Sequence, residues 1–397
     1  MAEPMTERIY LDWNATAPLR AEAQAAAAQA LGLSGNPSSV HAEGRAVRQL
    51  IEEARERVAA LVGSEPRNVV FTSGGTEANM MALSPFWLTS SHSAPCDHLL
   101  MSAIEHPSVL AGGRFPRDAL ETVPVLPDGR LDLSALEQAL SRLARKGRQR
   151  ALVSIMLANN ETGVVQPVEQ AAALAHAAGA LLHVDAIQAA GRIAFNINDI
   201  GADLLTLSGH KIGGPKGVGA LVRRDQALHL SDPLIKGGGQ ERGSRGGTEN
   251  VPGIVGFGAA AAAAQAAMAQ ESRHVAALRD RLEAGLKARM PAAVVLGADA
   301  PRLPNTTLLA VPGIKAETAV IALDLDGIAV SSGAACSSGK VQPSHVLSAM
   351  GVEPRLAQGA IRVSLGPATR ESEVDRFLDA WIRLCKTLLK ERPGIAA

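Results

Sequence analysis

Hydrophobic residues in the first two thirds of the chain fall into short, nearly continuous runs. The runs span residues 69–71, 98–101, 151–157, 181–184 and 203–207. Between several of them, apolar positions recur at helical spacing, as at 133–143 and 168–178. Short buried strands that alternate with helices are typical of a mostly parallel sheet covered on both faces. This part of the chain therefore predicts an α/β domain.

The pattern changes after an alanine-rich helix predicted near residues 256–269. Two helices at 20–31 and 42–62 precede the first strand, whereas beyond the alanine-rich helix we expect strands at 306–311 and 360–365 and helices at 316–325, 344–350 and 371–389. The last helix has one apolar stripe at helical spacing, made of Val374, Phe377, Leu378, Trp381, Ile382 and Cys385. The C-terminal third therefore predicts a smaller α+β domain.

Composition narrows the class of protein. A chain of 397 residues is long enough for two domains. Basic and acidic side chains number 39 each, so no excess charge indicates a nucleic acid or an anionic membrane as a direct partner. The first eight residues lack the apolar core of a signal peptide, and the apolar stretch 251–269 contains Pro252 and Gln265, which favours a packed helix over a membrane span. We expect a cytoplasmic protein.

The chain has three cysteines, Cys96, Cys336 and Cys385, too few for a disulfide framework and typical of a reducing compartment. Cys385 lies on the apolar helical stripe and is interpreted as a core residue, and Cys96 lies in a polar loop and receives no role. Cys336 lies in a run of small residues, 331–340, without hydrophobic periodicity. We favour a reactive thiol there over an incidental loop cysteine, although a free thiol is only partly ionised at neutral pH.

A lysine follows the apolar run at 203–207. Ser208, Gly209 and His210 end the run, Lys211 comes next, and a glycine-rich stretch follows. The carboxyl ends of parallel strands meet at the crevice where ligands bind, and a lysine that loses solvation there is a better amine nucleophile. The segment alone also fits a surface lysine in a glycine loop.

The other runs also end in polar or small residues. Residues 72–79 form a glycine turn that opens a helix and suits a phosphate, or an ordinary helix cap. His106 follows the second run, residues 159–163 supply tandem asparagines after the third, and Asp185 follows the fourth as either a buried partner of a cation or a helix cap. An amine for an imine, a carboxylate for a ring nitrogen, a histidine for a ring face and donors for a phosphate together describe pyridoxal phosphate.

With these motifs the chain resembles the cysteine desulfurases, which belong to the aminotransferase class V group and to pyridoxal-phosphate fold type I. The matching stretches are 10–12 with 15–18, 35–39, 72–79, 105–106, 159–163, 183–185 with Gln188, 208–211, 245–248 and 331–338. The segment from Cys336 to residue 346 is similar to the nitrogen-fixation and iron–sulfur-cluster branch. The resemblance implies a large domain with a seven-stranded sheet, residues 16–261, and a small domain formed by 1–15 and 262–397.

The resemblance also implies a role for each matching residue. Lys211 would form the imine with the cofactor, Asp185 would pair with the pyridine nitrogen, and His106 would stack on the ring and assist proton transfer. The remaining roles concern the phenolic oxygen of the ring (Gln188 and Asn160), the phosphate (Gly75, Thr76, Ser208 and His210), the phosphate of a neighbouring subunit (Thr248) and the substrate carboxylate (Asn36 and Arg362). For Arg362 an interdomain ion pair is the alternative. No metal is expected.

The activity that follows is conversion of L-cysteine to L-alanine, with the sulfur kept as a persulfide on Cys336 in a homodimer and passed to an acceptor or iron–sulfur scaffold protein. An aminotransferase of the same fold would need Lys211 and Asp185 but not Cys336, and a passive sulfur carrier would need no ring-binding set. Selenocysteine is an alternative substrate. Gly213 departs from the resemblance, because the family often has a bulky residue at this position.

Overall fold

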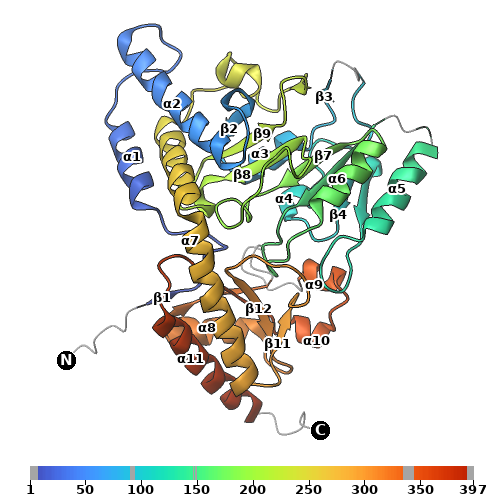
Figure 1. The fold of residues 1–397 in the computed structure, drawn as a ribbon, viewed down its shortest axis with the longest axis vertical. Coiled ribbons are helices and arrows are strands. Elements are labelled where there is room, and N and C mark those ends of the chain that lie inside the picture. The colour runs from blue at the N-terminus through green and yellow to red at the C-terminus, as the bar shows by residue number, and fades with distance from the viewer. Residues whose placement is uncertain (1–7, 90–93, 146, 148–149, 334–343, 391–397) are drawn as a thin grey trace.

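The computed structural model describes residues 8–89, 94–145, 147, 150–333 and 344–390. Its upper lobe in Figure 1 contains a seven-stranded sheet of order β2-β9-β8-β7-β6-β4-β5. The strands are β2 (Val69–Thr72), β4 (His98–Ser102), β5 (Leu120–Val123), β6 (Ala151–Met156), β7 (Leu181–Asp185), β8 (Leu204–Ser208) and β9 (Gly219–Arg223). Neighbouring strands are parallel except where β9 pairs with β8 and β2. The predicted α/β class with a mostly parallel sheet is confirmed.

The five predicted strands of this sheet are present, and two strands were missed. β5 reads Leu-Glu-Thr-Val, which has too few apolar residues to stand out, and it lies at the sheet edge with only one residue fully buried. β9 directly follows the glycine-rich loop and pairs antiparallel with both neighbours. Neither strand carries the long apolar run that marks the interior parallel strands.

Helices cover both faces of the sheet, because adjacent strand residues point to opposite sides. On one face Leu100, Val153, Leu182 and Leu205 pack in a core with α2, α5, α6 and the first part of α7. The opposite face packs against α3 and α4 in a second core. The helices of this lobe are α1 (Ala21–Leu31), α2 (Ala42–Leu61), α3 (Gly75–Ala82), α4 (Pro107–Leu110), α5 (Leu133–Arg145) and α6 (Val168–Ala177), and the short strands β3 (Trp87–Leu88) and β10 (His229–Leu230) pair beside them.

The lower lobe in Figure 1 has a four-stranded antiparallel sheet of order β11-β12-β15-β14. Its elements are β11 (Val294–Leu296), β12 (Thr306–Ala310), β14 (Ser331–Ser332), β15 (Ile361–Ser364), α8 (Ala316–Leu325), α9 (His345–Ala349), α10 (Pro354–Ala357) and α11 (Glu371–Lys390). The N-terminal strand β1 (Ile9–Tyr10) joins this lobe by pairing with β13 (Ile328–Ala329). The predicted smaller α+β domain is confirmed.

One helix links the two lobes. The predicted alanine-rich helix at 256–269 is in fact α7 (Val251–Arg289), which is 39 residues long and runs from the upper to the lower lobe in Figure 1. It packs in the core of the large sheet as far as Ala264 and in the core of the small sheet from Val275 onward. The proposed boundary at 261/262 therefore lies within a continuous helix.

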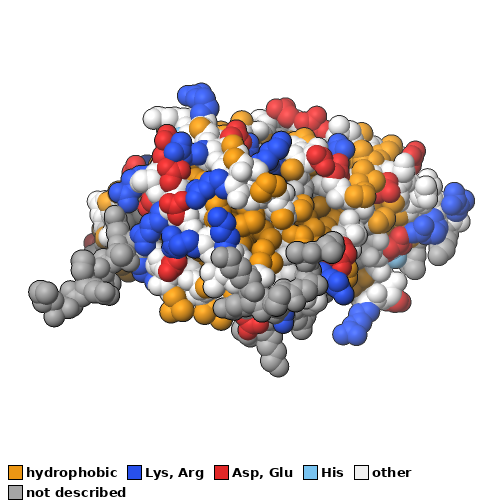
Figure 2. All heavy atoms as spheres, turned by 90° about the horizontal axis from the view of Figure 1, so that it is seen from below, with side chains coloured by type: hydrophobic (Ala, Val, Ile, Leu, Met, Phe, Trp, Pro, Cys, Tyr) orange, Lys and Arg blue, Asp and Glu red, His pale blue; other side chains and the backbone are white. Residues whose placement is uncertain are grey.

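α7 is also the one described helix that is long and apolar enough to cross a membrane by length and composition. A core helix passes the same test, and Phe257, Ala260 and Ala261 of α7 are buried in the protein. The end of the molecule formed by the small lobe shows basic and acidic side chains around an apolar area (Figure 2). No single sign of charge dominates that face, as expected from the balanced composition.

The structure corrects the interpretation of one cysteine. Cys96 was assigned to a polar loop, but it is buried in the core with Trp87 and Leu99, and burial raises the pKa of its thiol to about 11. Cys385 is buried in the small-lobe core, as predicted, and burial raises the pKa of its thiol to about 12. Both described cysteines are therefore protonated at neutral pH.

Candidate active site

The carboxyl ends of β2, β4, β6, β7 and β8 lie at one edge of the large sheet, because these five strands run in the same direction. A cavity of about 340 Å³ opens there, between the two lobes. Its lining contains ten of the predicted site residues, namely Gly75, Thr76, His106, Asn160, Asp185, Gln188, Ser208, His210, Lys211 and Arg362. The size is in the range of small-ligand sites.

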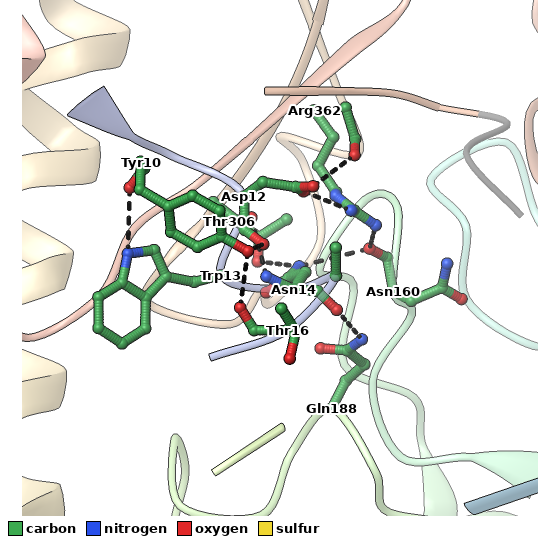
Figure 3. Close-up of polar contacts among 12 residues, drawn as sticks. Tyr10, Asp12, Trp13, Asn14, Thr16, Asn160, Gln188, Thr306 and Arg362 are labelled. Atoms are coloured by element: carbon green, nitrogen blue, oxygen red, sulfur yellow. Dashed lines mark hydrogen bonds and ion pairs between the residues drawn. The ribbon is translucent and has the colours of Figure 1, made fainter. Parts of the chain in front are cut away.

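The Lys211 amine is held at this cavity by the N-terminal segment. Lys211 ends the short 3-10 turn η3 (Gly209–Lys211) directly after β8. Its Nζ donates to the carbonyl oxygens of Asn14 at 2.6 Å and Ala15 at 2.8 Å. The side chain of Asn14 is itself fixed, since its Nδ2 donates to Thr306 Oγ1 at 2.9 Å (Figure 3). The first strand and the loop after it thus position the amine.

Arg192 fixes the orientation of Gln188 on the same side of the cavity. Its Nη1 donates to Gln188 Oε1 at 2.5 Å, and its Nη2 donates to Lys211 O at 3.3 Å. Burial, with a contribution from the charge of Arg362, lowers the pKa of Arg192 to about 10, so it stays cationic at neutral pH. Because Oε1 of Gln188 faces Arg192, its Nε2 is left as the donor, and it donates to Asn14 O at 3.0 Å.

Asp185 stands at the end of a buried chain of hydrogen bonds. Asn79 Nδ2 donates to Asp185 Oδ2 at 2.9 Å, and Thr206 Oγ1 donates to Asn79 Oδ1 at 2.6 Å. Thr206 in turn accepts from His183 Nε2 at 3.1 Å, and Ser154 Oγ lies 2.8 Å from His183 Nδ1. Burial lowers the pKa of His183 to about 3, so this histidine is neutral and can accept from Ser154 and donate to Thr206.

The same chain presents Asp185 to the cavity as an acceptor. Burial raises the pKa of Asp185, and hydrogen bonds from the Ile187 amide and from Asn79 act in the opposite direction, as do the charges of His106 and Lys211. A carboxylate in this position is stabilised by a cationic N–H donor entering the cavity. The arrangement therefore fits the protonated nitrogen of an aromatic ring.

His106 is held as a neutral imidazole. Ser108 donates its backbone N–H to His106 Nδ1 at 3.1 Å, and the Ser108 hydroxyl lies 2.8 Å from the same atom. Burial lowers the pKa of His106, with further lowering by Lys211 and His345, while Asp185 raises it. Because Nδ1 is an acceptor, the ring hydrogen belongs on Nε2. The imidazole can therefore lie against a planar ligand and donate or take up a proton at Nε2.

The start of α3 and the η3 turn form the anion end of the cavity. Gly74 has a φ of 155°, in the region that favours glycine, and a Cβ on Gly75 would lie 2.5 Å from Ile187 Cδ1. The backbone at Gly74 therefore favours glycine, and a side chain at position 75 would displace Ile187 at the cavity edge. The pKa of His210 is lowered to about 4 by burial and by the nearby cations Lys211, Lys216 and Arg192. Helix N–H groups and clustered positive charge suit a phosphate.

Arg362 lies at the small-lobe side of the cavity. Its Nη1 donates to Asn160 O at 2.9 Å, and its Nη2 donates to Asp12 Oδ1 at 2.8 Å (Figure 3). The other carboxylate oxygen of Asp12 accepts from Ser331 Oγ at 2.8 Å. Arg362 thus forms an ion pair with Asp12, but both residues belong to the small domain, so this is not the interdomain pair named above as the alternative, and Arg362 still lines the cavity.

Three predicted site residues are not brought to this cavity by the single chain. Asn36 is exposed and caps its own turn, accepting from the Ser38 amide at 2.9 Å. Thr248 is exposed and lines a separate cavity of about 150 Å³ with Thr72 and Arg245. Cys336 lies outside the described residues.

The structure adds residues that sequence reasoning missed. Asn79 was quoted only as the end of a motif, yet its amide uses both donors and its acceptor to hold Asp185, Ser108 and Thr206. Its position one turn into α3 after Gly75 was the available signal, because it places the side chain on the inner face of that helix. Asp12 was also quoted without a role.

The departure at Gly213 is explained by Arg20. Gly213 has a φ of 82°, and a Cβ there would lie 2.6 Å from Arg20 Cγ. The backbone of the two residues is joined by a hydrogen bond of 2.9 Å from the Arg20 amide to Gly213 O. The side chain of Arg20 therefore occupies the space that a bulky residue at position 213 would need.

Comparisons with known proteins identify the family of the chain. The family model described as aminotransferase class-V matches residues 9–377. A cysteine desulfurase of Cereibacter sphaeroides is 47% identical over 379 residues, which cover 94% of each chain. The cysteine desulfurase IscS of Dictyoglomus turgidum is 39% identical over 389 residues, covering 97% of this chain and 96% of the relative.

A solved structure has a similar fold. The X-ray structure of a NifS-like protein from Rickettsia africae ESF-5 matches with a TM-score of 0.84 and 33% identity, covering 96% of this chain and 100% of that one. Sequence identity, coverage and fold therefore point in one direction. The chain belongs to the aminotransferase class-V family and, within it, to the cysteine desulfurases.

Proposed function

We propose that this enzyme binds pyridoxal phosphate in the described cavity and converts L-cysteine to L-alanine, keeping the sulfur as a persulfide on Cys336. The observation that supports the proposal most directly is the meeting of four groups in one cavity. They are the Lys211 amine, the Asp185 carboxylate, the anion end at α3 and the Arg362 guanidinium. A phosphorylated pyridine aldehyde together with an amino acid substrate would use all four of these groups.

The cavity residues fit the cofactor one by one. Lys211 would hold its aldehyde carbon, Asp185 its ring nitrogen and His106 its ring face, while Gly75, Thr76, Ser208 and His210 would hold its phosphate. Gln188 and Asn160 would face its phenolic oxygen. Arg192 binds Oε1 of Gln188, which leaves the Nε2 donor of Gln188 for that oxygen. When bound, the cofactor withdraws electrons from the α-carbon of the substrate.

Substrate and sulfur use the small-lobe side. Arg362 would bind the substrate carboxylate, and Lys211 would move the α-proton. The Cys336 thiolate would attack the substrate sulfur, so that an S–S bond forms, the C–S bond breaks and its electron pair remains with the carbon, which is later protonated to give alanine. Cys336 is the remaining candidate among three cysteines, because Cys96 and Cys385 are buried in cores.

A homodimer would complete the site. Thr248 and Asn36 are exposed and away from the cavity of their own chain, which fits residues that reach the site of a second copy. Exposed apolar side chains gather in the segment that leads to Asn36 and just beyond it, at Leu31, Leu33 and Val40. Such side chains fit a surface that is covered in a dimer.

The sulfur acceptor would be a protein of iron–sulfur-cluster assembly. The IscS and NifS-like names of the relatives support this assignment, and a cytoplasmic location fits it. Selenocysteine would fit the same contacts, since its carboxylate and amine are those of cysteine.

The proposal is tested by incubating the purified enzyme with L-cysteine and dithiothreitol and measuring sulfide and alanine. We expect equimolar products, and one added sulfur on the peptide containing Cys336 when the reductant is left out. Cys336→Ser should keep the cofactor absorption band and release no sulfide. A keto acid in place of alanine, with unmodified Cys336, would instead identify an aminotransferase and overturn the proposal.

A further inference from the structure

The segment that carries Cys336 has two described ends, and both are attached to the rim of the active site. On its N-terminal side are β14 and Gly333, and on its C-terminal side are Ser344 and α9. One buried carboxyl group, that of Glu161, is hydrogen-bonded to the C-terminal end at Ser344 and lies near the N-terminal end. Glu161 belongs to the turn after β6, next to Asn160 of the cavity lining.

At the C-terminal end the contacts are hydrogen bonds between the lobes. Ser344 Oγ donates to Glu161 Oε2 at 2.6 Å, and it also caps α9 by accepting from the Leu347 amide at 3.1 Å. The next residue, His345, donates from Nε2 to Glu105 O at 2.9 Å. Two consecutive residues at the start of α9 are therefore bound to segments that follow β6 and β4 of the large sheet.

The N-terminal end passes near the same carboxyl group. A Cβ on Gly333 would lie 3.3 Å from Glu161 Oε2, and the Gly333 amide donates to Ala360 O at 3.0 Å. Ser331, two residues earlier, donates to Asp12, the ion-pair partner of Arg362. The N-terminal end is thus linked to Arg362 through Asp12, and the charge of Arg362 also acts on Glu161, the partner of the C-terminal end.

The charge on Glu161 depends on pH near neutrality. Glu161 is 4% exposed, and burial raises its pKa to about 7, while the Ser344 hydroxyl and the charge of Arg362 act to lower it. The carboxylate form makes the stronger hydrogen bond to Ser344, because bonds to ionised acceptors are stronger than bonds to neutral ones. The hydrogen bond between Ser344 and Glu161 should therefore become stronger as Glu161 loses its proton.

We propose that Glu161 is a positioning residue for sulfur transfer, whose carboxylate holds Ser344, at the C-terminal end of the Cys336 segment, against the large lobe. The inference rests on the proposed function, since the step it serves is attack of Cys336 on substrate sulfur. In that step L-cysteine and the enzyme thiol give L-alanine and the enzyme persulfide, with no added oxidant or reductant. Glu161 acts on this step through its hydrogen bond with Ser344.

The test compares the full-length wild type with Glu161→Gln in single turnovers over pH 6 to 8.5. The rate measured is persulfide formation on Cys336, by rapid quenching and mass spectrometry, and the quantity of interest is the ratio of the two rates. We expect a ratio of about tenfold at pH 8.5, the difference between a charged and a neutral hydrogen bond, falling towards one at pH 6. Titration of Cys336 itself cancels in the ratio.

A second readout separates positioning from damage to the fold. Exchange of the α-hydrogen of L-alanine with solvent deuterium needs the cofactor side of the site but no Cys336, and it should be the same in both proteins. Glu137→Gln, an exposed glutamate on α5, is the matched control and should behave as wild type throughout. Ser344→Ala should slow persulfide formation, and Ser344→Thr, which retains the hydroxyl, should restore it.

The outcomes are distinct. A ratio near one at all pH values, or a large ratio that does not change with pH, would overturn the role of the Glu161 charge. Loss of alanine exchange in Glu161→Gln would also overturn it, by showing general damage. Absence of persulfide in the wild type itself would instead contradict the proposed function, so the two ideas fail separately.

Discussion

On the large-lobe side of the cavity, Asp185 is held by neutral groups, whereas on the small-lobe side Arg362 is held between carbonyl and carboxylate oxygens. The neutral chain of Asn79, Thr206 and His183 is built from α3 and adjacent strands and is buried within one lobe. The pair of Arg362 and Asp12 joins the end of the chain's first strand to the small sheet. One side is therefore set by the fold of a single core, and the other by charged groups that meet between segments.

The two sides should respond to pH in opposite directions. The pKa of His183 is lowered to about 3 in the folded state, so its contribution to stability is present above its unfolded value and is lost as pH falls. The pKa of Glu161 is raised to about 7, so its contribution is present below its unfolded value and is lost as pH rises towards 7. Mild acid thus lowers the stability that neutral His183 contributes on the cofactor side. At Glu161 it removes the cost of keeping a buried carboxylate charged.

The largest effect is expected from Asp185→Asn. The variant removes the carboxylate that a protonated ring nitrogen would face, and breaking a buried ion pair costs about 3–5 kcal/mol, so turnover should fall on the order of a thousandfold. Steady-state kinetics with L-cysteine and the cofactor absorption spectrum would measure it. Asp132→Asn, at the remote cap of α5, is the control. Turnover within tenfold of wild type would show that Asp185 is only a structural cap.

A smaller and different effect is expected from Arg362→Gln. Loss of a charged partner for the substrate carboxylate costs about 2–5 kcal/mol, so KM for L-cysteine should rise about a hundredfold. Cofactor affinity should stay unchanged, because Arg362 belongs to the other side of the cavity. Arg362→Lys should lie between the two proteins. If cofactor affinity falls while KM is unchanged, the division into two sides is wrong.

The smallest effect concerns stability and sharpens the contrast in pH response. His183 has a pKa of about 6.5 in the unfolded chain, so the unfolded chain takes up a proton between pH 7 and pH 5 whereas the folded protein does not. The free energy of unfolding of the wild type should therefore fall by about 2 kcal/mol over this range. Denaturant unfolding of the holoenzyme at the two pH values would measure it. His183→Gln, which has no proton to gain, should lose correspondingly less. An equal loss in both proteins would contradict the assignment.

The sequence predicted the cofactor side better than the small-lobe side. Lys211, Asp185 and His106 each follow an apolar run, and parallel strands bring such positions together without any knowledge of the packing. Asn79 and Thr206 were quoted in the same stretches, but their bond joins residues 127 positions apart and needs coordinates. The pair of Glu161 and Ser344 spans 183 positions and depends on how the two lobes meet.

The length of α7 was underestimated for a more local reason. Alanine gives way to charged residues after position 269, and this change suggested an end to the helix. Val275, Leu278, Leu282 and Leu286 continue at helical spacing and are buried, so the signal was present in a more polar background. A helix that changes from one core to another changes composition without ending.

That shared helix limits how the enzyme can move and how it can be divided. α7 is 39 residues long and spans about 58 Å at 1.5 Å per residue, acting as a strut between the lobes. Because the helix is continuous and packs in both cores, a motion of one lobe against the other has to bend it or shift its packing. For protein engineering, neither lobe is a detachable module, because a cut at the junction would leave each half with an unpaired apolar stripe.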